Sequence, residues 1–443
     1  MHLEQYREPD EGLVRSITAV GLAASIVNVV VGGGIFVLPA AVAAEAGAAA
    51  PAVYLIGGCA ELLVAAAFVV LGRVVWRSGG AYAYVGAILG PFAGYLVGLF
   101  TWLVGAFASA ALLVGLAEMV ATLHPLLQTP LARAALIIAL YVMPVVVNLA
   151  RLRTGTSLVV ALTTIKLGTL LLFLVFASPM IQVGNLTWPE SLRVSELARG
   201  AIITFFAFGG LEMALGPSGE IRSPGQTLPL GVASGVVLIV LLYIAIQMTA
   251  QGVLGPALPT SVAPLADAAA RSGAGLRTLI LAGTAVSIAG ALVGTLLGAA
   301  RMLFALARAG VLPRTVGSVH PRSRIPYVAV LVHAVVAAVL ALTGTFLKLA
   351  ILASVSVAFV YLSTCIAAWL MAHRSRRAGE TPYSFRGSTQ FMSGLGAALL
   401  VALLTQMSRA EWMAMAFTMG AARLLYAFRR GPLSSWRFWG EGR

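Results

Sequence analysis

Apolar runs long enough to cross a membrane occupy most of this sequence. The chain has 443 residues, of which 60% are hydrophobic and only 10% charged, whereas soluble domains carry about 25% charged residues. A water-soluble fold could not cover so much apolar surface with so few charges, and about 20 apolar residues suffice for one helical crossing. We therefore predict an all-α membrane protein with twelve transmembrane helices, at about 17–44, 49–75, 85–120, 131–149, 157–177, 197–217, 228–252, 277–306, 327–343, 347–372, 391–407 and 411–428.

Basic residues lie mostly in the short segments between these runs. The net charge of +14 is carried by 27 arginines and two lysines. If the N-terminus is cytoplasmic, 21 arginines fall on the cytoplasmic side and six on the other, as the positive-inside rule requires. We expect a multi-pass protein of the plasma or inner membrane, with 1–16 and 429–443 as cytoplasmic termini. Nucleic-acid binding is not expected, because the arginines do not gather on one amphipathic face.

Two of the predicted helices contain glycine-rich breaks. The first has GGGIFVLP at 32–39, and the sixth has GGLEMALGP at 209–217. Glycine weakens a helix by about 1 kcal/mol and proline by about 3 kcal/mol, so each run should break near its middle. The two helices hold matching positions if 17–177 and 197–372 are structural repeats, which indicates a secondary transporter with a binding site at the midplane. The alternative is that the glycines only allow close helix packing.

Several motifs resemble the amino acid–polyamine–organocation (APC) superfamily of transporters. They are GGGIFVLP at 32–39, RSGGAYAYVGAILGPFAGYLVG at 77–98, FAFGGLE at 206–212, SPGQTLPLG at 223–231 and ARMLFALARAGVLPRTVGSVHPRSRIP at 300–326. The resemblance implies a LeuT-like five-plus-five inverted repeat, with 391–428 as helices 11 and 12. The sequence departs from the family pattern in one place. The usual acid and proline near the end of helix 2 are replaced by Val70 and Trp76, and Glu61 lies deeper in that helix.

A bound amino acid brings a carboxylate and an ammonium group into a site where unpaired charge is costly. A half-helix N-terminus offers free N–H groups and a positive dipole to the carboxylate, and unwound carbonyls accept from the ammonium. We expect the carboxylate at the N–H groups of Gly32, Gly33 and Gly34. The carbonyls expected to hold the ammonium, which the resemblance also implies, are those of Val30, Phe206, Ala207 and Gly209.

Polar and aromatic side chains near the breaks are further candidates. The resemblance makes Phe206 a lid over the substrate, whereas Phe205 and Phe208 fit simple packing. Glu212 either joins a gating network or has a structural pairing. No partner can be assigned to Glu61 or Glu118, and three serines either line the substrate pocket or bond their own helices: Ser287, Ser354 and Ser356.

Lys166 lies deep in an apolar run. It is the tenth residue from Ser157, about 14 Å along a helix and near the middle of a hydrocarbon core of about 30 Å. Ionisable residues at such depth are functional candidates. Some proton-coupled APC members place a helix-5 lysine where sodium-coupled relatives bind sodium, so the resemblance implies that Lys166 couples transport to protons. The alternative is a purely structural amine, and Lys348 at a helix end fits a membrane anchor.

We therefore expect a secondary active amino-acid transporter, operating by proton symport and alternating access, rather than an enzyme. The alternatives are an amino-acid or polyamine exchanger and a non-transporting amino-acid sensor. The expected partners are a small amino acid and membrane lipid. No metal or other cofactor is expected apart from the proton, and sodium is the less favoured coupling ion. The residues do not distinguish among amino acids, stoichiometries or oligomeric states.

Overall fold

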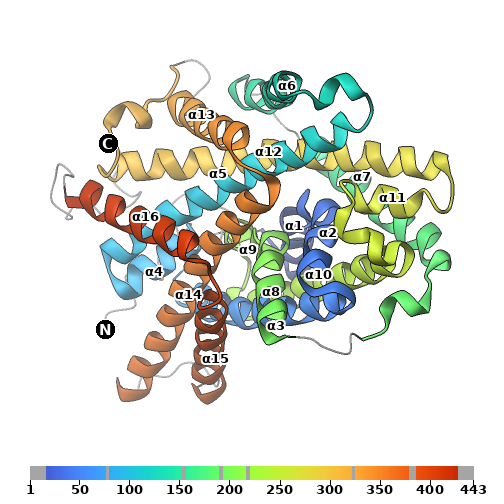
Figure 1. Cartoon of the computed structure of the whole chain (residues 1–443). Helices are drawn as coiled ribbons and strands as arrows, with labels where there is room; N and C mark the ends of the chain where they lie inside the picture. Colours follow the sequence, from blue (N-terminus) through green and yellow to red (C-terminus); the bar gives the residue numbers. More distant parts are fainter. Residues whose placement is uncertain are drawn as a thin grey trace.

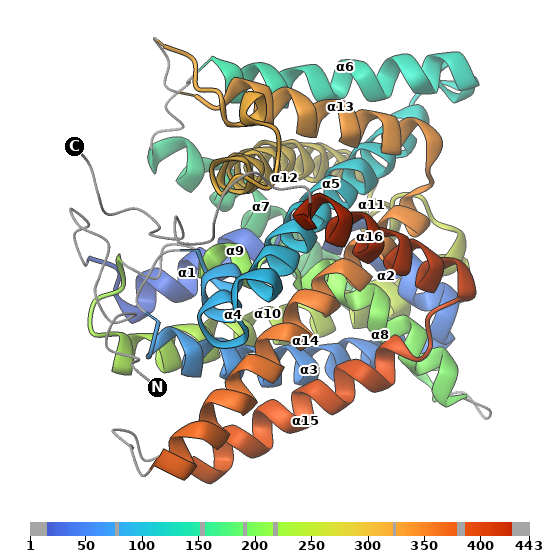
Figure 2. The ribbon, with the colours of Figure 1, turned by 90° about the vertical axis from the view of Figure 1, so that its left-hand side faces the viewer.

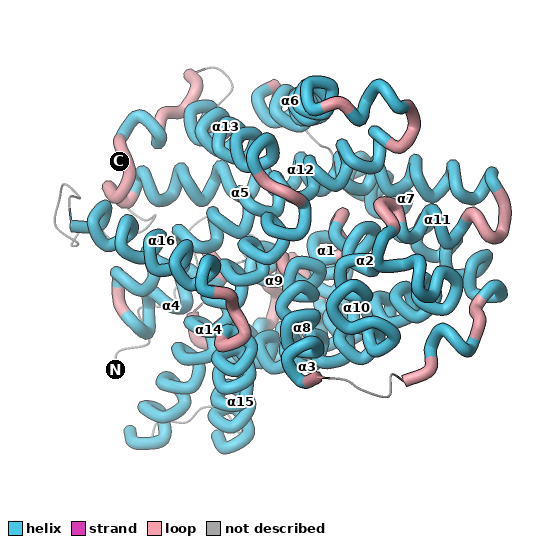
Figure 3. The backbone as a smooth tube through the Cα atoms, viewed as in Figure 1, coloured by secondary structure: helices cyan, strands magenta, loops and turns pink. Residues whose placement is uncertain are grey.

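The computed structural model describes residues 16–75, 79–150, 156–188, 193–215, 220–321, 325–378 and 386–427. Within these ranges the chain is helical, with short connecting loops (Figure 3). The β-type pairing in the described ranges is one isolated bridge between Ile17 and Ile221. The helices are α1 Ala19–Val30, α2 Gly34–Ala46, α3 Ala50–Gly72, α4 Ala81–Leu89, α5 Pro91–Ala121, α6 Pro130–Leu149, α7 Thr156–Ala177, α8 Val194–Phe208, α9 Leu211–Ala214, α10 Pro224–Leu254, α11 Pro264–Ala269, α12 Ala274–Arg308, α13 Tyr327–Thr343, α14 Phe346–Ala378, α15 Arg386–Leu404 and α16 Arg409–Ala427.

Each predicted apolar run contains one long helix or two consecutive helices. The runs at 17–44 and 197–217 are split into α1 with α2 and α8 with α9, as their glycines predict. The run at 85–120 is expected as one helix, but the structure has a break at Gly90 between α4 and α5. Gly90 adopts a φ of 94°, which favours glycine, and Pro91 then begins a new helix.

Helix length alone supports fewer than twelve crossings. Eight helical segments in the described ranges are long and apolar enough to span a membrane, and a ninth is possible if α15 and α16 form one span. These two helices are bent by 118° relative to each other. α1 and α13 are apolar but shorter, with 12 and 17 residues. Within the described ranges the structure is therefore all-helical, with eight candidate membrane spans, as in a membrane transporter.

The helices pack around α3, α5, α10 and α14. α5 packs against α12 and α14, and α10 packs against α1 and α3. α6 and α13 lie together along one edge of the molecule in both views (Figures 1 and 2). The outer surface of α6 exposes large apolar side chains, including Leu131 and Val142, which suits contact with lipid.

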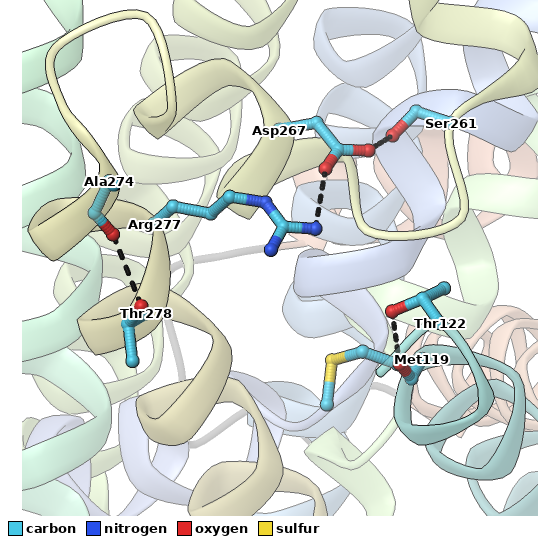
Figure 4. A network of polar contacts seen from close by, with 7 residues as sticks. All are labelled: Met119, Thr122, Ser261, Asp267, Ala274, Arg277 and Thr278. Carbon is cyan, nitrogen blue, oxygen red and sulfur yellow. Dashed lines mark hydrogen bonds and ion pairs between the residues drawn. The ribbon is translucent and has the colours of Figure 1, made fainter. Parts of the chain in front are cut away.

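A polar network fixes the connection between α10 and α12 (Figure 4). The Ser261 hydroxyl donates to the Asp267 carboxylate at 2.6 Å. Arg277 in the first turn of α12 forms an ion pair with the other oxygen of Asp267 at 3.6 Å. At the nearby end of α5, the Thr122 hydroxyl donates to the Met119 carbonyl at 2.7 Å. The ion pair between Asp267 and Arg277 ties the short helix α11 to the start of α12.

Candidate functional site

The first helix break separates α1 from α2 at Val31–Gly33. The N–H group of Gly32 donates to the carbonyl of Val30 at 2.6 Å, so this donor is occupied. The N–H groups of Gly33 and Gly34 have no acceptor in the described part of the chain. They lie at the N-terminus of α2, where the helix dipole favours a negative group. Two of the three donors expected for a carboxylate are therefore available.

The three glycines of this break have different surroundings. A Cβ atom at Gly33 would lie 2.7 Å from side-chain atoms of both Leu112 and Ile288. A Cβ atom at Gly34 would lie 3.0 Å from the ring of Phe206. At Gly32 the nearest atoms would be 3.8 Å away, and Gly32 keeps part of its surface exposed. Helix packing therefore requires Gly33 and Gly34, whereas only Gly32 has open space beside it.

The second break separates α8 from α9 at Gly209 and Gly210. Gly210 has a φ of 127°, which side-chain-bearing residues rarely adopt. A Cβ atom there would also lie 3.1 Å from Val29. Gly209 is half-buried and Ala207 is buried. Glycine at position 210 thus permits both the break and its close contact with α1.

Tyr243 in α10 connects the two breaks. Its hydroxyl lies 3.0 Å from the carbonyl oxygen of Val30 and 3.0 Å from that of Ala207. The side chain is fully buried and contacts the rings of Tyr54 and Phe208. Tyr243 is not among the residues expected from the sequence, although it is the single tyrosine inside the apolar run at 228–252.

The expected ammonium-binding carbonyls are not equally free. The Val30 carbonyl accepts from both Gly32 and Tyr243, and the Ala207 carbonyl faces Tyr243. The carbonyls of Phe206 and Gly209 have no donor among the described residues. The break in the sixth predicted helix therefore provides the two unoccupied acceptors of the expected set.

The three phenylalanines beside the second break separate into two groups. Phe206 is half-buried, lies against Gly34 and makes an edge contact with Phe346 at a ring distance of 5.9 Å. Phe205 and Phe208 are fully buried. Phe205 contacts Tyr361. This placement suits Phe206 as a covering ring and the other two as core residues.

Lys166 in α7 lies against α1. It contacts Asn28, which is two residues before the end of α1 at Val30. Its amine donates to the main-chain carbonyl of Asn28 at 2.7 Å and to the side-chain oxygen of Asn28 at 3.2 Å. The hydroxyl of Thr163 donates to the same side-chain oxygen at 2.5 Å. The amine of Lys166 thus contacts a main-chain carbonyl near the end of α1. Neither Asn28 nor Thr163 is among the residues expected from the sequence.

The remaining candidates lie in different environments. Glu212 accepts hydrogen bonds from the Gly210 N–H at 3.1 Å and the Tyr361 hydroxyl at 2.9 Å. Glu118 pairs with Arg133 at 3.5 Å, and its side chain is 40% exposed. Lys348 is exposed in the first turn of α14. Of the three serines, Ser356 bonds its own helix at Leu352, whereas the buried hydroxyls of Ser287 and Ser354 have no partner within the described ranges.

Comparison with known proteins identifies the family. The sequence model described as amino acid permease matches residues 17–422. An uncharacterised transporter of Mycobacterium tuberculosis is 31% identical over 67% of this chain and 69% of its own length. The serine/threonine exchanger of Bacillus subtilis is 26% identical over 85% and 86%, and the branched-chain amino acid permease of Lactococcus lactis is 26% identical over 79% and 80%. These relatives confirm the resemblance to the APC superfamily. The chain belongs to the amino acid permease family.

Proposed function

We propose that this protein is a secondary active amino-acid transporter that binds its substrate between the two helix breaks. The observation that carries the proposal is the hydroxyl of Tyr243 at 3.0 Å from a carbonyl of each break, which brings the breaks together. Free N–H groups at Gly33 and Gly34 suit the substrate carboxylate. Free carbonyls at Phe206 and Gly209 suit its ammonium group. In alternating access, movement of the helices around this site opens it to one side of the membrane at a time.

In this proposal the coupling ion is the proton, and Lys166 binds it. The amine donates to two oxygen atoms of Asn28, one in the main chain and one in the side chain. Hydrogen bonds from a charged ammonium are stronger than those from a neutral amine. Loss of the proton therefore weakens the contact between α7 and α1 close to the first break. Sodium is not required, because the ammonium itself supplies the positive charge beside α1.

The proposed topology has twelve crossings with both termini in the cytoplasm. α1 with α2 and α8 with α9 each form one broken crossing, and α15 and α16 form the last two. The repeats are 17–177 and 197–372, and the membrane is the plasma or inner membrane. Support comes from the arginine distribution. Residues 1–15 and 428–443, which contain most of both proposed termini, lie outside the described residues.

Transport by purified protein in empty liposomes tests the proposal. We would impose a pH gradient, acidic outside, without sodium, and supply radiolabelled serine, isoleucine or arginine in separate assays. Accumulation of at least one probe above its external concentration is expected, and it should vanish when a protonophore removes the gradient. Accumulation that requires sodium, or that survives the protonophore, would contradict proton coupling.

Amino-acid exchange is a second candidate, because one of the relatives is named as a serine/threonine exchanger. Liposomes preloaded with unlabelled amino acid separate the two. An exchanger takes up label only into preloaded liposomes, whereas a symporter also fills empty ones under a pH gradient. A sensor would show flux in neither condition. Polyamine transport has less support, because Glu212 beside the break already accepts two hydrogen bonds.

A further inference from the structure

Two carboxylates that neither the substrate site nor Lys166 uses lie buried together behind the second break. Glu61 in α3 is 2% exposed and Glu212 in α9 is 4% exposed. They interact electrostatically, and Tyr361 in α14 interacts with both. The rings of Phe68 and Phe205 contact Tyr361 at ring distances of 6.0 and 6.3 Å. Three helices thus enclose an acidic pair among apolar rings.

The two carboxylates differ in their hydrogen bonds. One oxygen of Glu212 accepts from the Gly210 N–H and the Tyr361 hydroxyl. Neither oxygen of Glu61 has a hydrogen-bond partner in the described part of the chain, and the second oxygen of Glu212 is also without one. A buried polar group without a partner is costly. Both oxygens of Glu61 are therefore buried beside Glu212 without a hydrogen bond.

Among the residues that the structure describes, the groups that interact with Glu61 provide no positive charge. They are Glu212 from α9, Tyr361 and Cys365 from α14, and Tyr243 from α10. Two ionised carboxylates buried side by side without a cation are strongly disfavoured, because each lacks solvation and each repels the other. Hydrogen bonds to a carboxylate favour its ionised form. Glu212 accepts from two donors and therefore suits the anion. Glu61 has only the hydroxyl of Tyr361 nearby, which already donates to Glu212, and accepts no hydrogen bond of normal geometry, so it suits the neutral acid.

We propose that Glu61 and Glu212 form a proton-binding pair that holds one proton on Glu61 at neutral pH. Glu212 follows the second break by two residues, so a movement of α9 away from α14 would remove the hydroxyl of Tyr361 from it. Glu212 would then bind a proton as well. Proton occupancy of the pair thus depends on the position of α9. This consequence rests on the proposed function, but the pair itself does not.

Infrared spectroscopy of the purified full-length protein tests the pair without any substrate. A protonated carboxyl group has a C=O stretching band that an ionised one lacks. The wild type should show this band at neutral pH, and Glu61→Gln, which keeps the shape of the neutral acid, should lose it. Glu118→Gln is the matched control, because Glu118 is half-exposed and paired with Arg133. A band that is absent in the wild type, or unchanged in Glu61→Gln, would overturn the proposal.

A second variant keeps the test independent of how Glu61→Gln folds. Tyr361→Phe removes only the hydroxyl that donates to Glu212, so Glu212 should bind a proton more readily and the carboxyl band should grow at neutral pH. A band of unchanged intensity and position would contradict a shared role of Tyr361. In liposomes, Glu61→Gln should keep exchange of amino acid but lose part of the accumulation driven by a pH gradient. Full accumulation by this variant would overturn the link to transport while leaving the infrared result to decide on the pair.

Discussion

The hydroxyl group of Tyr243 lies 3.0 Å from the carbonyl oxygen of Val30, the last residue of α1. The same hydroxyl is equally close to the carbonyl of Ala207 in α8. A hydroxyl has one proton to donate, so it can satisfy only one of these carbonyls at a time. Tyr243 therefore links the two breaks and leaves one carbonyl able to accept from a substrate ammonium.

Replacing this hydroxyl should weaken substrate binding with little effect on folding. Tyr243→Phe keeps the ring contacts with Tyr54 and Phe208 and removes one hydrogen bond, worth about 1 kcal/mol or about fivefold in an equilibrium constant. Because the hydroxyl aligns the carbonyls of both breaks, we expect the affinity for the transported amino acid to fall by at least about this factor. Scintillation proximity binding with the transported probe measures the loss.

Tyr54→Phe is the matched control for this variant. Tyr54 is as deeply buried as Tyr243, and its ring contacts the rings of Phe208 and Tyr243. Its hydroxyl, however, has no hydrogen-bond partner in the described residues. Removing an unpaired buried hydroxyl should not lower stability. Equal losses of binding in Tyr54→Phe and Tyr243→Phe would show that the hydrogen bonds of Tyr243 do not organise the site.

Gly32→Ala should abolish or strongly reduce uptake while the protein remains folded. The added Cβ atom meets no protein atom closer than 3.8 Å, so the fold has room for it. A substrate that lies against this backbone has no such room, and an extra methyl in a filled site costs about 1–3 kcal/mol, about fivefold or more in affinity. Uptake in liposomes and thermal stability in detergent are the two measurements.

Gly33→Val provides the contrasting case. From the sequence alone, this variant should block the approach of the carboxylate and leave the protein folded. The structure gives another reason for a loss of activity, because a Cβ atom at position 33 would lie 2.7 Å from Leu112 and Ile288. We expect Gly33→Val to lower thermal stability as well as uptake.

Normal uptake by Gly32→Ala would show that the ligand does not approach the first break at Gly32.

The positions of the breaks could be predicted from the sequence because glycine and proline act locally. The GGG at 32–34 and GG at 209–210 weaken their helices whatever packs against them, and the structure has breaks at both places. The break at Gly90 is missed although Gly90 and Pro91 carry the same local signal, because the expected helix bounds followed hydropathy, which stays high through this run. Hydropathy reports burial in lipid, and it does not report the backbone angle of one residue.

The contacts of the candidate site could be predicted only in part. The depth of Lys166 follows from counting residues along one helix, but its partner Asn28 lies in α1, 138 residues away. Tyr243 and Tyr361 act through hydroxyls directed at other helices. The choice among neighbouring helices depends on how side chains interlock, and one sequence contains no record of it. The same limit applies to Glu61, whose neighbours come from α9, α10 and α14.

Phe206→Ala should impair transport without a large loss of stability. Phe206 is half-buried and covers Gly34, so its removal uncovers the first break from the side of Phe346. Phe205 is fully buried, and deleting a core phenylalanine costs about 3–5 kcal/mol in soluble proteins. Phe205→Ala should therefore lower the melting temperature more than Phe206→Ala does. Among the molecules that remain folded, Phe205→Ala should reduce transport less than Phe206→Ala does. Equal uptake per folded molecule in the two variants would assign Phe206 to packing alone.

Lys166→Ala should lose uptake driven by a pH gradient and retain some exchange. The amine of Lys166 holds both the main-chain and side-chain oxygens of Asn28, so its removal abolishes the charge-dependent contact between α7 and α1 but leaves both breaks intact. Uptake into empty liposomes, with a pH gradient and no sodium, measures coupling; counterflow into preloaded liposomes measures exchange. Lys348→Ala, which removes the exposed lysine of α14, should behave like the wild type in both assays. If Lys166→Ala still concentrates the probe as the wild type does, protons cross by another group, and Glu212 is the next residue to replace.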